Sequence, residues 1–227
     1  MESNILFRAS QVGNLMVEPR SKTETLSETT KTYLIEVFIK HKYGREKDIT
    51  SKYFSKGIAV EEDSITLYSR LTKEFYIKNE ENMRNEFVTG TPDLMNGDVV
   101  IDIKSSWDIF SFWKSKTSPL NKDYYWQLQV YMWLTGRTKA KLAYCLVNTP
   151  ETLIDDEKKK YTYRSGITME EQSTEALELI ERNCKYDDIP IAERMHVVDI
   201  AYNPDDIERL KVRIDECRKY MKETFNL

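Results

Sequence analysis

The chain has 227 residues, of which 40% are hydrophobic and 32% are charged, and its formal net charge at pH 7 is −4. This length and composition are typical of a globular protein, so we expect a single domain over residues 1–227. A negative net charge excludes a protein that coats nucleic acid through a general basic field, but it allows an enzyme with a locally basic groove. The sequence has no apolar stretch of membrane-spanning length, and residues 1–20 lack the apolar core of a signal peptide, so we expect a cytoplasmic protein without a membrane partner.

The cysteines and histidines form no recognisable ligand pattern. The three cysteines are far apart in sequence, so they provide neither a disulfide framework nor the four thiolates of an iron–sulfur cluster. His41 and His196 stand alone, which argues against a zinc site.

The first half of the chain predicts two helices followed by strands. Residues 27–42 begin with a serine suited to capping, carry apolar residues at helical spacing and end before Gly44, which indicates a helix. A second helix is predicted over about residues 55–71. The strands predicted in this half are residues 74–78, 85–95 and 98–104.

The second half alternates between helices and strands. Residues 124–136 predict a helix closed by Gly136. The further predicted elements are a strand at 141–148, a helix at about 169–183, a strand at 193–202 and a last helix that begins after Asn203-Pro204. The run at 158–160 of three lysines follows three acidic residues and indicates a solvated loop, with a DNA contact as the alternative. We therefore predict an α/β fold with a mixed central sheet flanked by helices.

Two aspartates lie on the strands around Asn96-Gly97, the dipeptide most typical of a hairpin turn. A hairpin can place Asp93 beside Asp102, and two neighbouring carboxylates repel each other unless a divalent cation lies between them. Lys104 follows Asp102 by two residues, so both side chains point to the same face of the strand. Oxygen ligands without histidine or cysteine favour Mg²⁺, with Mn²⁺ as a substitute.

A simpler interpretation is an ion pair between Asp102 and Lys104, with Asp93 as a turn residue. Two further features favour a reactive site. Glu61 precedes the strands and supplies a third carboxylate, and Gln127 and Tyr131 lie one helical turn apart on an otherwise apolar helix.

These motifs, in this order, resemble the PD-(D/E)xK nuclease superfamily, and within it the phage-lambda-type (YqaJ-like viral) exonucleases. The segments that carry the resemblance are "RASQVGNLMVEPRS" at 8–21, "KGIAVEED" at 56–63, "GTPDLMNGDVVIDIK" at 90–104 and "WQLQVYMWLTG" at 126–136. The resemblance runs from about residue 8 to residue 148. It implies a restriction-endonuclease-like core in the predicted α/β fold.

The resemblance also implies roles for the acids and the lysine. Asp93, Asp102 and the backbone carbonyl of Ile103 would hold Mg²⁺, and Glu61 would complete or surround that site. Glu62 is an alternative to Glu61, because a slip of one residue on a helix cannot be judged from sequence. Lys104 would orient the attacking water.

A second set of residues matches the pocket that binds a terminal 5′-phosphate in this family. Ser10, Thr91 and Gln127 would line it. The family also uses an arginine at a position that is Ser3 here, and Arg8 is the nearest substitute.

The expected function is therefore a Mg²⁺-dependent exodeoxyribonuclease that degrades double-stranded DNA from 5′ to 3′ in phage-type homologous recombination, inside the bacterial host cell if a phage encodes it. The expected partners are double-stranded DNA ends, a single-strand annealing protein and further copies of the chain, as a homo-oligomer of the trimeric type. The alternatives are a RecB- or Cas4-like nuclease of other polarity, a structure-selective endonuclease, or a non-catalytic DNA-binding module on the same fold.

Overall fold

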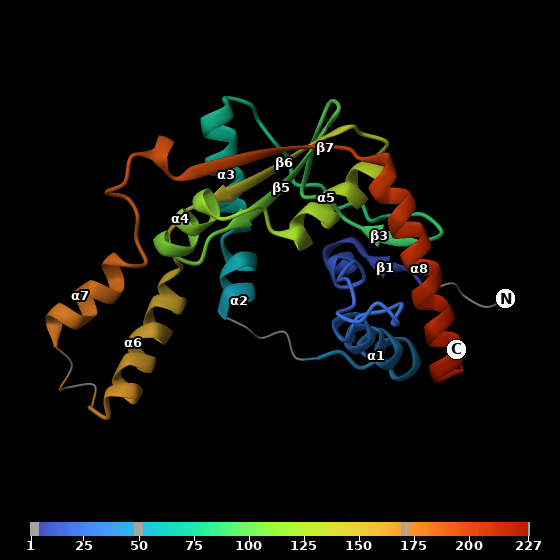
Figure 1. Ribbon diagram of the computed structural model, residues 1–227. Coiled ribbons are helices and arrows are strands. Elements are labelled where there is room, and N and C mark those ends of the chain that lie inside the picture. Colours follow the sequence, from blue (N-terminus) through green and yellow to red (C-terminus); the bar gives the residue numbers. More distant parts are fainter. Residues whose placement is uncertain (1–4, 48–51, 169–170, 172, 227) are drawn as a thin grey trace.

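The computed structural model describes residues 5–47, 52–168, 171 and 173–226 (Figure 1). Its helices are α1 (Glu28–Tyr43), α2 (Lys52–Ala59), α3 (Glu61–Thr72), α4 (Ile109–Thr117), α5 (Lys122–Thr135), α6 (Glu151–Ser165), α7 (Thr174–Arg182) and α8 (Pro204–Phe225), with short 3₁₀ helices η1 (Ala9–Asn14) and η2 (Ile191–Glu193). Its strands are β1 (Phe7–Arg8), β2 (Met83–Arg84), β3 (Val88–Gly90), β4 (Leu94–Asn96), β5 (Val99–Ser105), β6 (Lys139–Cys145) and β7 (Met195–Ala201).

The strands form two mixed sheets. The larger sheet has the order β4-β5-β6-β7, in which β5 and β6 run parallel and both outer strands are antiparallel to their neighbours. A small sheet has the order β1-β3-β2. The predicted α/β architecture, a mixed sheet flanked by helices, is thus confirmed.

Successive side chains of β5 contribute to two separate parts of the core, one on each face of the larger sheet. Val100 belongs to the core cluster that includes Leu128 of α5, whereas Ile101 and Ile103 pack in a second cluster with Tyr68 of α3. Successive strand residues point to opposite faces, so Asp102 and Lys104 share the α5 face with Val100. The functional side chains of β5 therefore lie between this strand and α5.

Helix ends were the most predictable feature. Ser27 caps α1 by accepting a hydrogen bond from the Thr30 amide, and Gly44 ends the helix with φ +63°. α5 likewise ends at Gly136 with φ +67°. Asn203 caps α8, with a proline at the first helical position, as the sequence predicts. The strands predicted at 98–104 and 193–202 are also confirmed, as β5 and β7.

The helix predicted over 55–71 is wrong as a single element. It is broken between α2 and α3 at Val60, whose φ of −116° and ψ of 14° are not helical. The Val60 side chain is completely buried and packs with Ile65 against the sheet. The chain therefore starts a new helix directly after the buried valine. The first turn of this helix, α3, contains three acidic residues.

The strand predicted at 74–78 is not a strand. The segment is extended, with Tyr76 packed on the ring of Tyr68 while Phe75 and Ile77 face outward, so the alternation that predicted a strand is present. Its bonds to the neighbouring chain come mainly from side chains, as in the 2.7 Å hydrogen bond from Asn96 to Glu74. No backbone ladder forms along it in the described chain.

The strand predicted at 85–95 is two strands, β3 and β4, separated by the segment that contains Pro92. Proline cannot donate to a ladder, which explains the break. The hairpin turn lies one residue later than predicted, because Asn96 pairs with Val99 and leaves Gly97 and Asp98 in the turn. Gly97 has φ +54°, which is why glycine suits this position.

Two helices were missed. The lysine run at 158–160 lies on α6 and not in a loop, and α4 follows β5 where no element was predicted. The helix predicted at about 169–183 begins at Thr174 as α7, and residues 169, 170 and 172 lie outside the described chain. Figure 1 shows α6 and α7 beyond the carboxyl ends of β5 and β6, at the opposite end of the molecule from α1 and α8.

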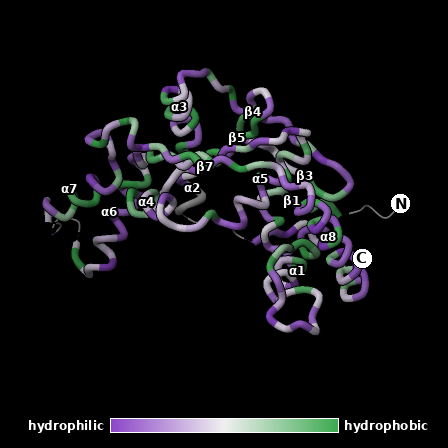
Figure 2. Tube along the Cα trace, turned by 45° about the horizontal axis from the view of Figure 1, so that its top comes forward, coloured by the Kyte–Doolittle hydropathy of each residue, from purple (hydrophilic) through white to green (hydrophobic). Residues whose placement is uncertain are grey.

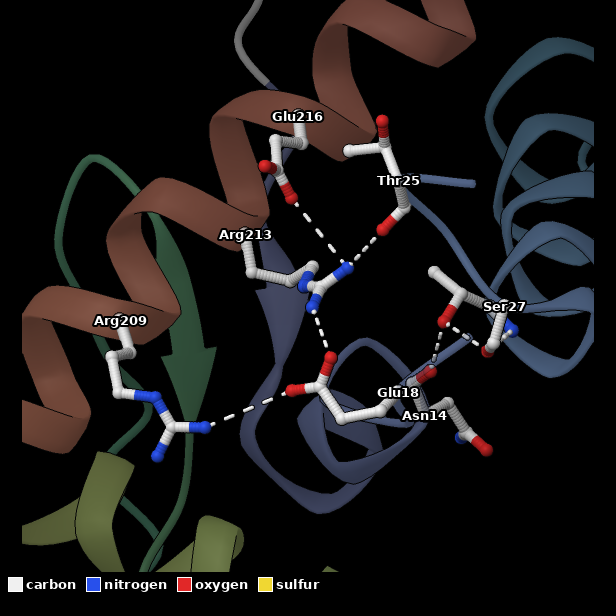
Figure 3. Close-up of polar contacts among 8 residues, drawn as sticks. Asn14, Glu18, Thr25, Ser27, Arg209, Arg213 and Glu216 are labelled. Carbon is white, nitrogen blue, oxygen red and sulfur yellow. Dashed lines mark hydrogen bonds and ion pairs between the residues drawn. The ribbon is translucent and has the colours of Figure 1, made fainter. Parts of the chain in front are cut away.

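α8 ties the N-terminal segment to the rest of the fold (Figure 3). Arg213 donates to the Thr25 carbonyl and forms a 3.1 Å ion pair with Glu18, and Arg209 lies 3.7 Å from the same carboxylate. Thr30 adds a 2.8 Å hydrogen bond to the Asn14 carbonyl. These contacts hold η1 in place.

α8 is amphipathic and covers the core from outside. Figure 2 shows hydrophilic and hydrophobic residues alternating along it. Its buried residues recur at helical spacing and are Ile207, Leu210, Ile214, Cys217 and Met221. Among the described residues, no helix is both long and apolar enough to cross a membrane.

Candidate active site

The predicted acids and the lysine meet at the carboxyl ends of the parallel strands β5 and β6. A cavity of about 700 Å³ opens there. Its lining includes Glu61, Asp93, Ile103, Lys104, Ser111 and Tyr124. Segments far apart in the sequence, from α3 to α5, thus contribute to one space.

The hairpin brings Asp93 and Asp102 together. Leu94 pairs with Ile101 in the β4–β5 ladder, so the next position along the register places Asp93 opposite Asp102. Asp93 accepts a 2.7 Å hydrogen bond from the backbone amide of Ile103. Burial, reinforced by the charge of Asp102, raises the pKa of Asp93 to about 7, although Lys104 and the Ile103 amide act in the opposite direction.

Lys104 is the cation of the site. Its ammonium lies 2.8 Å from Asp102, whose side chain is only 1% exposed. Burial by itself lowers the pKa of Lys104, but Asp102 and Asp93 raise it above its ordinary value. The two carboxylates therefore favour the charged form of Lys104, and the ion pair of the simpler interpretation exists together with the acid pair.

The structure distinguishes the two candidates for the third acid by position. Glu61 lines the same cavity as Asp93, and its carboxylate is held by a 2.6 Å hydrogen bond from Lys78. Glu62 instead lines a separate cavity next to Phe75.

α5 presents one face to β5, made of Tyr124, Gln127 and Tyr131 at helical spacing. The Gln127 amide donates to Asp102 at 3.1 Å and to the Tyr131 hydroxyl at 2.9 Å, and its oxygen accepts from Lys104 at 3.3 Å. All the partners that a buried amide needs are thus inside the protein. The sequence singled out Gln127 because it is polar, but not these partners.

Two residues of the site were not predicted. The Lys104 ammonium lies 4.8 Å from the ring centroid of Tyr124, a cation–π contact. Lys56 of α2 is 1% exposed and donates a 2.8 Å hydrogen bond to the Trp107 carbonyl, which fixes the chain just after β5. Burial lowers the pKa of Lys56 to about 8. Tyr124 could have been found from its helical spacing to Gln127, whereas Lys56, the first residue of the segment 56–63, has no spacing that singles it out.

The residues assigned to a phosphate pocket lie on neighbouring segments. In the parallel pairing of β1 with β3, Arg8 lies opposite Thr89. Ser10 follows in η1 and Thr91 comes directly after β3, so both lie just beyond the paired residues. Thr91 accepts a 3.1 Å hydrogen bond from Asn82. Arg8 is exposed, and its charge acts on Tyr33 of α1. Ser3, the place of the family's arginine, lies outside the described residues.

The carboxylate oxygens of Asp93 and Asp102 suit a hard divalent cation. In the structure, Asp93 accepts from the Ile103 amide and Asp102 pairs with Lys104. Asp102 Oδ2 is buried and makes no hydrogen bond, so Lys104 alone neutralises it. In the described chain, no three His, Cys, Asp or Glu side chains already surround a common point. A half-buried carboxylate that lines the cavity, Asp93, next to the buried carboxylate of Asp102 nevertheless fits Mg²⁺, whose ligands are oxygens.

The fold is one that solved phage-type exonucleases share. Among solved structures, the chain is similar to a phage-related exonuclease from Haemophilus somnus 129PT, with a TM-score of 0.76 and 27% identity over 98% of this chain and 96% of that one. It is also similar in fold to the alkaline exonuclease LHK-Exo from Laribacter hongkongensis, with a TM-score of 0.66 and 14% identity over 96% and 88% of the two chains. No family model and no curated protein sequence matches the chain.

These similarities confirm the resemblance to the phage-type exonucleases. A further structure, LHK-Exo in complex with dAMP, gives a TM-score of 0.62 at 16% identity and covers 97% of this chain. The likeness extends over nearly the whole chain and not only over residues 8–148, where the sequence motifs lie. The similarity to these exonuclease structures supports a nuclease activity for the chain.

Proposed function

We propose that this protein is a Mg²⁺-dependent exodeoxyribonuclease that degrades double-stranded DNA from 5′ to 3′. The observation that carries the proposal is that Asp93, Lys104 and Glu61 line one cavity, with the buried Asp102 directly behind Lys104 as its ion-pair partner. Metabolic enzymes with coincidental acids have no need of a buried amide that connects Asp102 to Lys104, as Gln127 does.

Asp93, Asp102 and the Ile103 carbonyl would hold Mg²⁺, with Glu61 around it. When bound, the metal supplies Lewis acidity toward the phosphate and a more acidic water. Lys104, fixed by Asp102 and Gln127, holds the attacking water in place and offsets negative charge that develops on the phosphate. Because its pKa is raised, Lys104 acts as a cation and not as a base.

We further propose that the protein acts on DNA ends during phage-type homologous recombination, together with a single-strand annealing protein. Ser10 and Thr91 would receive a terminal 5′-phosphate, with Arg8 as the cation of the pocket. Gln127, which the resemblance assigns to the same pocket, would act on it indirectly, by holding Asp102 and Lys104 in place. The phage-related exonuclease at 27% identity supports this context.

The test is digestion of linear duplexes that carry a label at either the 5′ or the 3′ end, with and without a 5′-phosphate, in Mg²⁺. We expect loss of the 5′ label first. Lys104→Ala should reduce the rate by about a hundred-fold or more, the scale of removing one preorganised charge from a transition state. Lys141→Ala is the matched control, because Lys141 lies on the adjacent strand, pairs with Asp199 and does not line the cavity.

Equal rates for wild type and Lys104→Ala would refute the site. Loss of the 3′ label first, or internal cuts, would instead assign the opposite polarity or an endonuclease. Full activity after exhaustive chelation, or a requirement for Zn²⁺, would refute the Mg²⁺ assignment.

A further inference from the structure

α4 forms the ridge between two cavities. Ser111 of this helix lines the catalytic cavity, Phe110 lines a neighbouring cavity of about 320 Å³, and Trp107 just before the helix lines both. Asp108 caps α4 by accepting a 2.7 Å hydrogen bond from the Ser111 amide. α4 therefore lies between the catalytic cavity and the neighbouring one.

The outer face of α4 is aromatic. Phe110, Trp113, Lys114 and Thr117 follow the i, i+3, i+4, i+7 spacing of one helical face. Phe110 is 73% exposed and Trp113 is 54% exposed. Phe112, on the opposite face, is buried with Leu146 and Tyr186. The helix is therefore anchored from below while two large rings face outward, which is typical of a binding surface.

The same helix is positively charged. It carries Lys114 and Lys116 and no acidic residue. In the part of the chain that the structure describes, neither lysine forms an ion pair; the Lys116 ammonium instead lies 4.5 Å from the ring centroid of Trp113. The lining of the smaller cavity has equal numbers of acidic and basic side chains and therefore no net charge. The excess of positive charge in this region comes from the two lysines of α4.

We propose that α4 is a platform for single-stranded DNA next to the catalytic cavity. Unpaired bases stack on Phe110 and Trp113, and their phosphates lie against Lys114 and Lys116. Aromatic rings combined with lysines are the usual means of binding single strands without sequence preference. This inference rests on the proposed nuclease function. It adds that the protein binds single-stranded DNA as well as duplex ends, and that α4 provides the binding surface.

The test measures binding of a fluorescein-labelled oligothymidylate of about 12 nucleotides, within the usual site size, by anisotropy in Ca²⁺. Trp113→Ala should weaken binding by about five- to a hundred-fold, the range found for loss of one stacked base. Trp113→Phe keeps a ring and should retain most of the affinity. Lys114→Gln should weaken binding less at high salt than at low salt, because it removes a phosphate contact.

Phe75→Ala is the matched control, because Phe75 is 88% exposed and lies outside both cavities. It should bind the oligonucleotide as wild type does. All variants concern exposed side chains, and equal melting temperatures would show that they fold.

Wild-type affinity in Trp113→Ala, or the same loss in Phe75→Ala, would overturn the platform. Digestion of the end-labelled duplexes distinguishes failure of the platform proposal from failure of the proposed nuclease function. A wild type that degrades duplex DNA while Trp113→Ala binds normally would refute the platform alone, whereas absence of any cleavage would refute the nuclease.

Discussion

At the scale of single residues, the energetic cost of the site is concentrated on Asp93. Its carboxylate is buried beside Asp102, and only Lys104 and the Ile103 amide favour its charged form. A carboxyl whose pKa is raised by folding binds its proton more tightly in the folded state than in the unfolded chain. Folding therefore raises the free energy of ionising Asp93, and the divalent cation that we propose would offset this cost by lying between the two carboxylates.

This predicts how stability depends on pH. As pH rises from about 4 toward 7, the unfolded chain loses the Asp93 proton first, so the free energy of unfolding should fall by about 1.4 kcal/mol per pH unit from this group. Asp93→Asn should lack this contribution. The measurement is urea unfolding in EDTA at several pH values. An identical slope in both proteins would disprove the assignment, and added Mg²⁺ should stabilise wild type more at pH 8 than at pH 6.

Gln127 gives a second prediction at this scale, because its amide already bridges Asp102, Lys104 and Tyr131. Gln127→Ala should slow cleavage of 5′-phosphorylated and 5′-hydroxyl ends by the same factor, about ten- to a hundred-fold, the value of one hydrogen bond to a charged group. Thr91→Val should change the ratio of the two rates. A ratio altered by Gln127→Ala would show that the amide contacts the phosphate.

At the scale of elements, the site depends on how closely β3 and η1 approach α5. A methyl group added at Gly90 would lie 2.7 Å from the Tyr131 ring and 2.8 Å from the Ala9 side chain. Gly90 therefore permits the contact that brings the Ser10 and Thr91 segments next to the face of α5 that carries Gln127.

Gly90→Ala should lower the free energy of unfolding by about 1–3 kcal/mol, as overpacking does. Gly57→Ala is the control, because no atom lies within 4 Å of the added methyl and the position is inside α2, where alanine is preferred by about 0.5–1 kcal/mol. Chemical denaturation of both variants gives the comparison. A neutral Gly90→Ala would mean that β3 can move away from α5 without cost.

At the scale of the whole molecule, the net charge of −4 raises the question of how an acidic protein would stay on DNA. Local charge provides part of the answer, since Lys114 and Lys116 lie on α4, the helix whose Ser111 lines the catalytic cavity. We propose that assembly answers the rest: a homo-oligomer, of the trimeric type implied by the resemblance, would enclose the duplex.

Light scattering at micromolar concentration should then give a mass of three times the 26.9 kDa chain. Processive digestion should persist at salt concentrations that weaken the initial binding, because an enclosed duplex does not depend on counterion release. A monomer at all concentrations would exclude the ring.

The sequence by itself determined the elements that carry strong local signals and the residues of the acid site. The alternating apolar pattern of β5, the hairpin before it and the glycine that ends α5 are local features, and they sufficed to place Asp93 opposite Asp102 and Lys104 on the same face. The resemblance to phage-type exonucleases followed from motifs in the same segments.

Only the tertiary structure decided the features that depend on contacts between distant segments. The break at Val60 coincides with burial against the sheet, and it directs Glu61, not Glu62, to the cavity of Asp93. Two of the three partners of Gln127, Lys104 and Asp102, come from β5, 23 and 25 residues away. Segment 74–78 has the alternating burial of a strand but no backbone ladder. The apolar periodicity of a sequence indicates only which side chains are buried, whereas backbone pairing depends on which other segment lies alongside.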